Sequence, residues 1–197
     1  MEKMKINRAC VFCASSRQTD KIYLEAAYQL GTILARQSIT VVYGGGAVGL
    51  MGELANGALA EGGEVIGVIP KFMVDLEWGH QKITELKIVE NMHERKEMVM
   101  KGSDAIIALP GGCGTFEELF EALTMKRLGF YLNPIVLVNI NRFYDPLIEL
   151  LENCISERFM DERHRDMWSV AKQAEEVMDA IKNTPKWTSE ARHFASI

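Results

Sequence analysis

The chain has 197 residues, of which 48% are hydrophobic and 25% are charged, and its net charge at pH 7 is -5. This composition is that of a globular domain with a sizeable core, and it argues against intrinsic disorder. The negative charge disfavours nucleic acid and anionic membranes as partners, so any phosphate ligand must be held by local groups. No segment has the character of a membrane span or a signal peptide, and we expect a cytoplasmic protein.

Short apolar runs alternate with amphipathic segments along most of the chain, which predicts strands alternating with helices. The predicted strands are 8–13, 39–43, 64–69, 85–89, 105–109, 135–139 and a short one at 167–170. The predicted helices are 20–38, capped by Asp20, then 50–61, 92–100, 115–128, 145–157 and 171–182, with an irregular loop or short helix at 71–82. Residues 1–183 are expected to form a single domain, and residues 184–197 a C-terminal tail without a pattern.

Strands that are apolar throughout and separated by helices predict a mostly parallel sheet with helices on both faces. The expected fold class is therefore doubly wound, Rossmann-like α/β. In this architecture ligands bind outside the carboxyl ends of the strands. Ser15, Gly44 to Gly46 and Gly111 to Thr115 all follow such ends, so one cleft can collect them.

The four cysteines give no sign of a disulfide framework. Cys10 and Cys13 form a C-x-x-C, but they lie within a predicted strand, where residues three apart point to opposite faces. We therefore interpret them as buried structural thiols rather than as a redox pair or a zinc site. Cys113 differs, because thiols at helix N-termini are often reactive, although it is also small enough simply to fill a glycine loop.

The most informative stretch is L-P-G-G-C-G-T-F-E-E at residues 109–118, which follows an apolar strand and opens a predicted helix. Its three glycines let a ligand approach the backbone, and the N–H groups of the new helix would face that ligand. We expect an anion here, most plausibly a phosphate. Glu117 and Glu118 lie in the first turn of this helix, where carboxylates also complement the helix dipole by about 0.3 to 1 kcal/mol.

A second glycine turn, G-G-G-A-V-G at residues 44–49, follows another predicted strand and contains G-x-G-x-x-G. This pattern is found in dinucleotide-binding oxidoreductases, which also need an acidic residue at the end of the next strand. Here that strand ends with Ile69, Pro70 and Lys71, so the dinucleotide interpretation lacks one of its parts. No glycine turn is followed by Lys-Ser or Lys-Thr, so there is no Walker sequence either.

Two glycine turns at one edge of the sheet favour a single mononucleotide. Glu118, one turn into the helix from Thr115, is near enough to the phosphate turn to reach the sugar of that nucleotide. Cleavage of an N-glycosidic bond passes through a cationic ribosyl group, which a carboxylate stabilises while it activates water. Arg95 and Lys96 are candidates to fix the phosphate or keep this carboxylate ionised, although their charge pattern fits a solvated helix face equally well.

These segments together resemble the Lonely Guy family, the cytokinin riboside 5'-monophosphate phosphoribohydrolases. The matching segments are residues 110–118 (family motif P-G-G-x-G-T-x-x-E), 43–52 (second glycine turn), 12–16 (end of the first strand) and 92–96 (M-H-x-R-K). The resemblance extends over nearly the whole chain, and the occurrence of these motifs in this order is highly specific. Two departures are visible: Ala14 stands where glycine is common, and Cys113 where an aromatic residue is often found.

The resemblance implies hydrolysis of an adenine-type nucleoside 5'-monophosphate, either AMP or a cytokinin riboside monophosphate, to the free base and ribose 5-phosphate. It implies no metal or other cofactor, Glu118 and Arg95 as the catalytic residues, and a homodimer with its sites near the interface. The substrate-binding residues that we predict are Ser15, Gly44, Gly45, Gly46, Gly49, Glu77, Lys96, Gly111, Gly112, Cys113, Gly114, Thr115, Phe116, Glu117 and Thr124.

Three other functions stay open at this point. A carrier of a nucleotide or a phosphorylated cofactor would bind in the same cleft without hydrolysis, and would not need Glu118 and Arg95. A lysine decarboxylase, an old label of the family, would need pyridoxal phosphate and a Schiff-base lysine, and no lysine stands out in the glycine turns. A hydrolase that uses the Cys113 thiol would need a partner histidine, and none of the four histidines has an evident placement for that role.

Overall fold

The computed structural model describes residues 5–74, 76 and 79–195. Its centre is a seven-stranded sheet in the order β4-β3-β2-β1-β5-β6-β7, and every pair of neighbouring strands is parallel. The predicted doubly wound α/β fold is therefore confirmed. The strands are β1 (Arg8–Phe12), β2 (Thr40–Tyr43), β3 (Val65–Pro70), β4 (Glu85–Val89), β5 (Ala105–Ala108), β6 (Ile135–Val138) and β7 (Ser169–Ala171).

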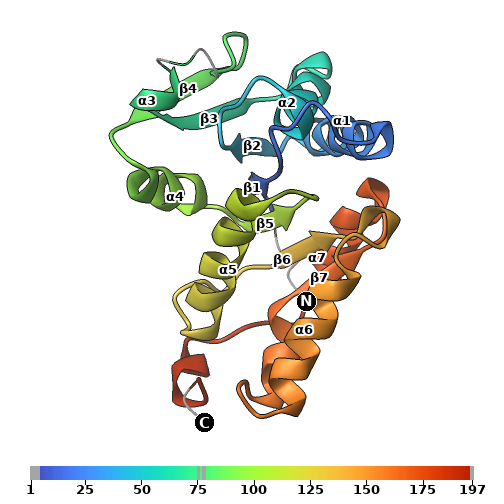
Figure 1. The fold of residues 1–197 in the computed structure, drawn as a ribbon, viewed down its shortest axis with the longest axis vertical. Helices are drawn as coiled ribbons and strands as arrows, with labels where there is room; N and C mark the ends of the chain where they lie inside the picture. The colour runs from blue at the N-terminus through green and yellow to red at the C-terminus, as the bar shows by residue number, and fades with distance from the viewer. Residues whose placement is uncertain (1–4, 75, 77–78, 196–197) are drawn as a thin grey trace.

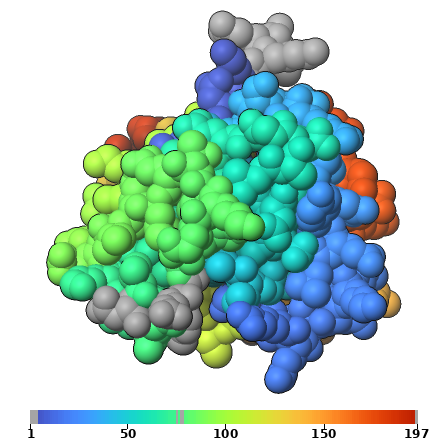
Figure 2. Space-filling view, turned by 90° about the horizontal axis from the view of Figure 1, so that it is seen from above, coloured from blue at the N-terminus to red at the C-terminus, as the bar shows by residue number. Residues whose placement is uncertain are grey.

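Helices cover both faces of this sheet, as Figure 1 shows with α1 and α2 on one side and α4 and α5 on the other. One core contains residues of α1, α2 and α7, and the other contains residues of α4, α5 and α6. Figure 2 looks onto the β4 end, where the teal atoms of α2 adjoin the green atoms of the segment around β4. The helices are α1 (Lys21–Arg36), α2 (Gly49–Ala60), α3 (Lys71–Val74), α4 (Met92–Met100), α5 (Cys113–Arg127), α6 (Asp145–Ser156) and α7 (Val177–Asn183).

Strand β1 shows why the central strands are apolar along most of their length. Its residue Cys10 packs in one core and its neighbour Val11 in the other, because successive side chains point to opposite faces. Cys13, just beyond the strand, lies in the core opposite to that of Cys10, as predicted, and both side chains are buried. All four cysteines are free.

The direction of chain travel across the sheet reverses at β1. This strand pairs with both β2 and β5, so that Val11 lies between Tyr43 and Ile107. The loops that leave the carboxyl ends of these three strands therefore emerge side by side. In an open α/β sheet this switch point is where ligands bind.

The helices α1 and α2 pack with their backbones in direct contact. A Cβ atom added to Gly57 would lie 2.0 Å from the carbonyl oxygen of Tyr28, and one added to Gly31 would lie 2.1 Å from that of Leu54. At its start, α1 is capped as predicted, since the Asp20 side chain accepts a hydrogen bond from the Ile22 N–H at 3.1 Å. This close crossing holds the loops after β1 and β2 together.

The C-terminal third differs from the prediction in its boundaries. The short strand predicted at 167–170 is β7, which is shifted to Ser169–Ala171 and pairs with β6. The Ala171 carbonyl also accepts a hydrogen bond from Asn139 N at 2.7 Å. Because Ala171 is part of strand β7, the helix predicted at 171–182 starts only at Val177, after a 3-10 turn at Ala174–Glu176.

The segment 187–195 is ordered against α5, although its sequence predicted no regular structure. It contains a 3-10 helix, Ser189–His193, and the Trp187 indole N–H donates to the Lys126 carbonyl at 2.6 Å. The rings of Trp187 and Phe194 also pack on the buried His164. Single aromatic contacts of this kind have no periodicity, which is why a search for periodic patterns misses them.

None of the helices in the described part of the chain combines the length and the apolar composition that a membrane crossing requires.

Candidate active site

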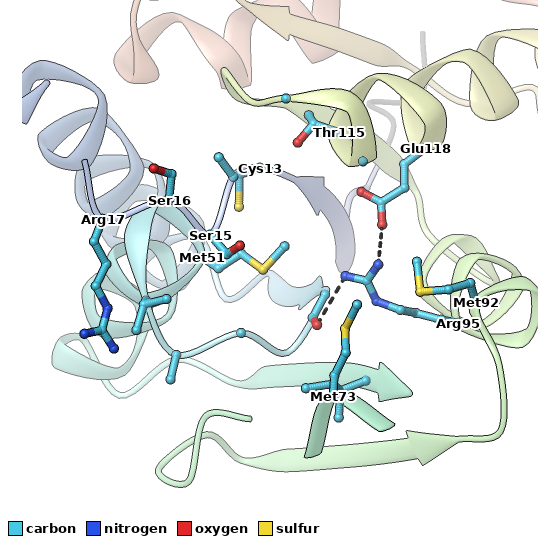
Figure 3. Close-up of a pocket in the computed structure, with 18 residues that line it drawn as sticks. Cys13, Ser15, Ser16, Arg17, Met51, Met73, Met92, Arg95, Thr115 and Glu118 are labelled. Atoms are coloured by element: carbon cyan, nitrogen blue, oxygen red, sulfur yellow. Dashed lines mark hydrogen bonds and ion pairs between the residues drawn. The ribbon is translucent and has the colours of Figure 1, made fainter. Parts of the chain in front are cut away.

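A cavity of about 710 Å³ opens at the switch point of the sheet. The loops after β1 and β2, the start of α5 and one face of α4 form its walls, and Figure 3 shows the residues that line it. Part of the lining is apolar, with Ile69, Met51, Met73 and Met92. The cavity thus combines a polar rim with an apolar wall, which suits a ligand that carries both an anionic group and a flat ring.

An ion pair between Arg95 and Glu118 lies at the end of the cavity where α4 approaches α5 (Figure 3). Arg95 Nη1 is 3.0 Å from Glu118 Oε1, and only 6% of Arg95 and 5% of Glu118 is exposed. The guanidinium also donates from Nε to the Val68 carbonyl at 3.1 Å and from Nη2 to the Gly44 carbonyl at 3.3 Å. Three partners on different segments therefore fix the orientation of Arg95.

The pKa of Glu118 is raised from 4.5 to about 6. Burial is the main cause, because it disfavours the charged form, and the positive charge of Arg95 opposes the shift. Glu118 is therefore mostly ionised at neutral pH, and its pKa lies close to neutrality, as is typical of acid–base residues in active sites. Burial also raises the pKa of the Cys13 thiol far above its usual range, so this cavity-lining sulfur stays protonated.

The Lys96 side chain binds two carboxylates and does not line the cavity. Its ammonium group forms ion pairs with Glu117 and with Glu121, the latter at 2.7 Å from Nζ to Oε2. Hydrogen bonds to both carboxylates raise the pKa of Lys96, so it is charged. This cluster ties α4 to α5 immediately beside the Arg95–Glu118 pair, and it holds the two helices that carry the pair.

The glycines of the turn after β2 make room for the protein's own atoms. A Cβ on Gly44 would lie 2.0 Å from Arg95 Nη2, and one on Gly46 would lie 2.8 Å from the Met51 sulfur. Gly49, whose φ of +62° favours glycine, would place its Cβ 2.4 Å from the Ser16 carbonyl oxygen. This turn therefore leaves space for the Arg95 guanidinium and packs against the loop after β1.

The glycines at the start of α5 have a different environment. Nothing lies within 4 Å of a Cβ built on Gly112 or Gly114, and both residues line the cavity. The helix begins at Cys113, two residues earlier than predicted, and Gly112 provides no side-chain cap for its first N–H groups. Open space beside uncapped backbone N–H groups is the arrangement that binds phosphate at a helix N-terminus.

Two buried tyrosines fix the loops around the site. The Tyr43 hydroxyl donates to the Gly46 carbonyl at 3.1 Å, and the Tyr144 hydroxyl donates to the Leu109 carbonyl at 2.8 Å. Each bond satisfies a carbonyl in an irregular segment that has no sheet partner there. The glycine turns are thus held by the core beneath them.

The structure gathers about half of the predicted site residues around the cavity. Those that line it are Ser15, Gly44, Gly46, Arg95, Gly112, Gly114, Thr115 and Glu118. Those in the described part of the chain that do not line it are Gly45, Gly49, Lys96, Gly111, Cys113, Phe116, Glu117 and Thr124. Glu77 lies outside the described residues.

Several of the predicted residues outside the lining have visible structural roles. Phe116 stacks on Phe143 with ring centroids 6.2 Å apart, and Gly111 makes room for the Thr115 side chain. Cys113 and Thr124 are exposed on α5. Of these residues, only Gly111 contacts a side chain that lines the cavity, that of Thr115.

Other lining residues were not predicted from the sequence, among them Arg17 and the three methionines. Arg17 follows β1, so its position at a strand end was a usable signal. The methionines come from three separate segments with no common pattern, and their meeting depends on the tertiary fold. No lysine lines the cavity among the described residues, and within them no three His, Cys, Asp or Glu side chains gather into a metal site.

Solved structures with the same fold include two proteins of molybdenum cofactor biology. The molybdenum cofactor carrier protein of Chlamydomonas reinhardtii matches 91% of this chain and 98% of its own, with a TM-score of 0.70 and 20% identity. The molybdenum cofactor binding protein of Rippkaea orientalis matches 91% and 97%, with a TM-score of 0.69 and 23% identity. At these identities the likeness establishes the fold alone.

Sequence relatives identify the family. Residues 51–181 match a family model described as "Possible lysine decarboxylase". The chain is 40% identical over 182 residues to the cytokinin riboside 5'-monophosphate phosphoribohydrolase LOG3 of Arabidopsis thaliana, covering 92% of this chain and 85% of LOG3. It is 43% identical over 174 residues to the enzyme of that name from Rhodococcoides fascians, covering 88% of both chains. The chain therefore belongs to the Lonely Guy family, whose curated members carry the name phosphoribohydrolase although the family model keeps the older decarboxylase description.

Proposed function

We propose that the protein hydrolyses the N-glycosidic bond of an adenine-type nucleoside 5'-monophosphate, AMP or a cytokinin riboside monophosphate, and releases the free base and ribose 5-phosphate. The observation that carries this proposal is the buried Arg95–Glu118 pair, 3.0 Å apart, in the same cavity as the open glycine turn of α5. The names of relatives that are about 40% identical over most of the chain support it independently.

The reaction needs a negative charge next to the anomeric carbon. When the bond from C1' to the base nitrogen breaks, the base leaves with the electron pair and takes up a proton from solvent, and the ribosyl group becomes cationic. The Glu118 carboxylate stabilises this cation and accepts a proton from the water that attacks C1'. Arg95 keeps Glu118 in place and favours its ionised form, against the effect of burial.

The phosphate of the substrate belongs at the start of α5 in this proposal. Gly112, Gly114 and Thr115 supply backbone N–H groups and a hydroxyl there, and Ser15 adds a hydroxyl from the loop after β1. The apolar wall of Met51, Met73 and Met92 is suited to the face of an adenine or to an apolar group on its N6. The reaction as proposed requires no metal or other cofactor.

The direct test is release of ribose 5-phosphate from AMP and from an N6-isoprenoid AMP. We expect turnover by the wild type, and a loss of at least about 100-fold in kcat for Glu118→Gln and for Arg95→Ala. Cys113→Ser is the matched control and should stay active, because its side chain is exposed and does not line the cavity. Retained turnover in Glu118→Gln would refute the mechanism.

A carrier function is the second candidate. The structural neighbours that bind or carry molybdenum cofactor share the fold, but a carrier has no need for a buried carboxylate beside a cavity-lining arginine. Tight binding of AMP without turnover by the wild type would favour the carrier. If Cys113→Ser were folded and bound AMP but had no activity, this result would instead favour a hydrolase that uses the Cys113 thiol.

We also propose that the protein is a cytoplasmic homodimer. Apolar side chains of α5 and the loop after it are exposed, among them Phe120, Met125 and Phe130, and they offer a surface for a second copy. The four free thiols fit a reducing compartment. A monomeric mass by light scattering, or recovery of the native protein in a membrane or secreted fraction, would contradict the respective part.

A further inference from the structure

His164 is buried beneath the C-terminal segment 187–195 with its ring nitrogens unpaired. It lies in the 3-10 helix Glu162–Met167, and 0% of it is exposed. Neither ring nitrogen has a hydrogen-bond partner within the described part of the chain. The Phe194 ring lies 5.5 Å and the Trp187 ring 6.2 Å from the imidazole, measured between centroids. Buried polar groups are normally paired, so this imidazole requires an explanation.

Positive charges surround His164. Arg127 of α5 and Arg163 of the same 3-10 helix both oppose a charge on its ring, and Asp161 favours one. The Asp161 carboxylate is already bound by Arg163, at 2.6 Å from Oδ1 to Nε. The Arg163 guanidinium also lies over the Phe194 ring, 3.7 Å from its centroid. A proton on His164 would therefore add a further positive charge to a covered group of cations.

Segment 187–195 is held at one end of α5. The Trp187 indole N–H donates to the Lys126 carbonyl at 2.6 Å, and a Cβ built on Gly129 would lie 2.6 Å from the Ser189 carbonyl oxygen. In Figure 1 this red segment lies at the lower end of α5, whereas the start of the helix, which lines the cavity, is at the other end. The segment can therefore leave α5 without disturbing the sheet or the cavity.

We propose that segment 187–195 is an acid-sensitive strap, which is released from α5 when the His164 imidazole takes up a proton. The protonated ring has two N–H donors, and neither finds an acceptor among the described residues while the strap is closed. Release exposes both donors to water and removes the new charge from its apolar surroundings. The strap lies away from the cavity, so this proposal goes beyond the proposed reaction and does not depend on it.

The pKa of His164 gives the direction of the effect. Burial, with a smaller contribution from Arg127, lowers this pKa below its usual value of 6.5 while the strap is closed. In the open form the ring is solvated and its pKa returns to about 6.5, so the open form binds the proton more tightly. Closure is therefore most stable above about pH 6.5 and weakens as the pH falls below that value.

The other charged groups near His164 keep their charge in this pH range. Burial lowers the pKa of Lys126 only to about 8, so its ammonium group remains charged at pH 7 and below. Hydrogen bonds from Arg163 hold the pKa of Asp161 well below its usual range, so this carboxylate remains ionised. On α6, Glu152 is paired with Arg165. The charged residues of the strap itself are all exposed: Glu190, Arg192 and His193.

Hydrogen exchange of the Trp187 indole N–H tests the proposal, because this group is bonded to α5 only while the strap is closed. NMR on protein with isotope-labelled tryptophan gives its protection factor, in which the pH dependence of exchange itself cancels. We expect this factor to fall roughly tenfold from about pH 7 to about pH 5 in the wild type. In His164→Phe, which keeps a ring but does not titrate, it should be constant. His193→Gln is the matched control, since it removes an exposed histidine of the strap, and it should behave as the wild type.

The same coupling must appear in the titration of His164. Trp187→Ala removes the ring and the hydrogen bond that close the strap, so the pKa of His164 should rise toward 6.5. An NMR titration of the imidazole C–H signals measures it, and it needs no change at His164. Equal pH dependence of protection in the wild type and His164→Phe would overturn the proposal, and so would an unchanged His164 pKa in Trp187→Ala. Neither measurement uses AMP turnover, so failure of the proposed reaction would be seen separately.

Discussion

The Glu118 carboxyl group must be ionised to act as proposed, and its pKa of about 6 then sets the acid limit of activity. Below that pH the protonated group can neither stabilise a cation nor take a proton from water. We expect kcat/KM for AMP to rise with pH through about 6 and then to level off, because this ratio reports ionisations of the free enzyme. A profile of kcat/KM from about pH 5 to about pH 8 measures this rise, the acid limb of the profile, directly.

Arg95 lowers the pKa of Glu118, so its removal should move this limb to higher pH. In Arg95→Gln, where turnover is expected to be weak, carbon NMR titration of the Glu118 carboxyl gives the same information. Cys113→Ser should keep the wild-type limb. If the pKa of Glu118 in Arg95→Gln equalled its pKa in the wild type, the coupling between the two groups would be contradicted.

The variants Gly44→Ala and Gly114→Ala should lose activity for different reasons. The Cβ of Gly44→Ala collides with the Arg95 guanidinium, the movable end of a long side chain, so the protein should fold while losing the ion pair and most of its kcat. The Cβ of Gly114→Ala meets no protein atom within 4 Å and should not reduce stability, since alanine favours helix over glycine by up to about 1 kcal/mol. It occupies space at the phosphate turn, however, so KM should rise.

Steady-state kinetics together with thermal unfolding separates these outcomes. Equal losses of kcat in both variants would mean that the two glycine turns do not have the distinct roles that their surroundings indicate.

The roles of single residues could be predicted only in part. The motif at residues 110–118 and the rule that ligands bind at strand ends pointed to Glu118 and the open glycines. The partner of Gly44 could not be foreseen, because Arg95 is 51 residues away in the chain and its distance to Gly44 depends on the whole sheet. Lys96 carries the charge expected of a ligand-binding residue, but the carboxylates that occupy it are on another helix.

At the scale of elements, the crossing of α1 and α2 depends on Gly57. In Gly57→Ala the new Cβ would lie 2.0 Å from the Tyr28 carbonyl oxygen, a backbone atom that cannot turn away. We expect the free energy of unfolding to fall by about 1 to 3 kcal/mol, as in other overpacked sites, despite the better helix propensity of alanine. Denaturant unfolding measures this loss.

Asn56→Ala is the matched control for that crossing. It lies one residue earlier in the same helix with its side chain exposed, so its stability should be unchanged or slightly raised. A Gly57→Ala protein as stable as Asn56→Ala would show that the two helices can separate at no cost.

The elements themselves were largely predictable, because strands buried on both faces read as continuous apolar runs. The misplaced elements share one cause. The strand β7 and the late start of α7 are set by pairing with β6, and segment 187–195 is set by contacts of Trp187 with α5. Tertiary partners decide such segments, and their own sequence carries no period that would reveal them.

At the scale of the whole molecule, the proposed dimer makes a prediction about α5. Met125→Glu places a charge among the exposed apolar side chains Phe120 and Leu128, and it should convert a dimer into a monomer because a buried unpaired charge is costly. Leu150→Glu, at an exposed leucine of α6, is the matched control and should remain dimeric. Light scattering gives both masses, and a dimeric Met125→Glu would place the interface elsewhere.

The ion pair of Arg95 and Glu118 joins the two halves of the sheet. Arg95 is anchored to Val68 of β3 and to Gly44 after β2, whereas Glu118 belongs to the helix that follows β5. Neither half contains the pair by itself, and contacts between distant segments form late because loops must close first. In a refolding experiment, turnover should therefore return only when the two halves of the sheet have docked. We expect it to return later than the helical circular dichroism signal.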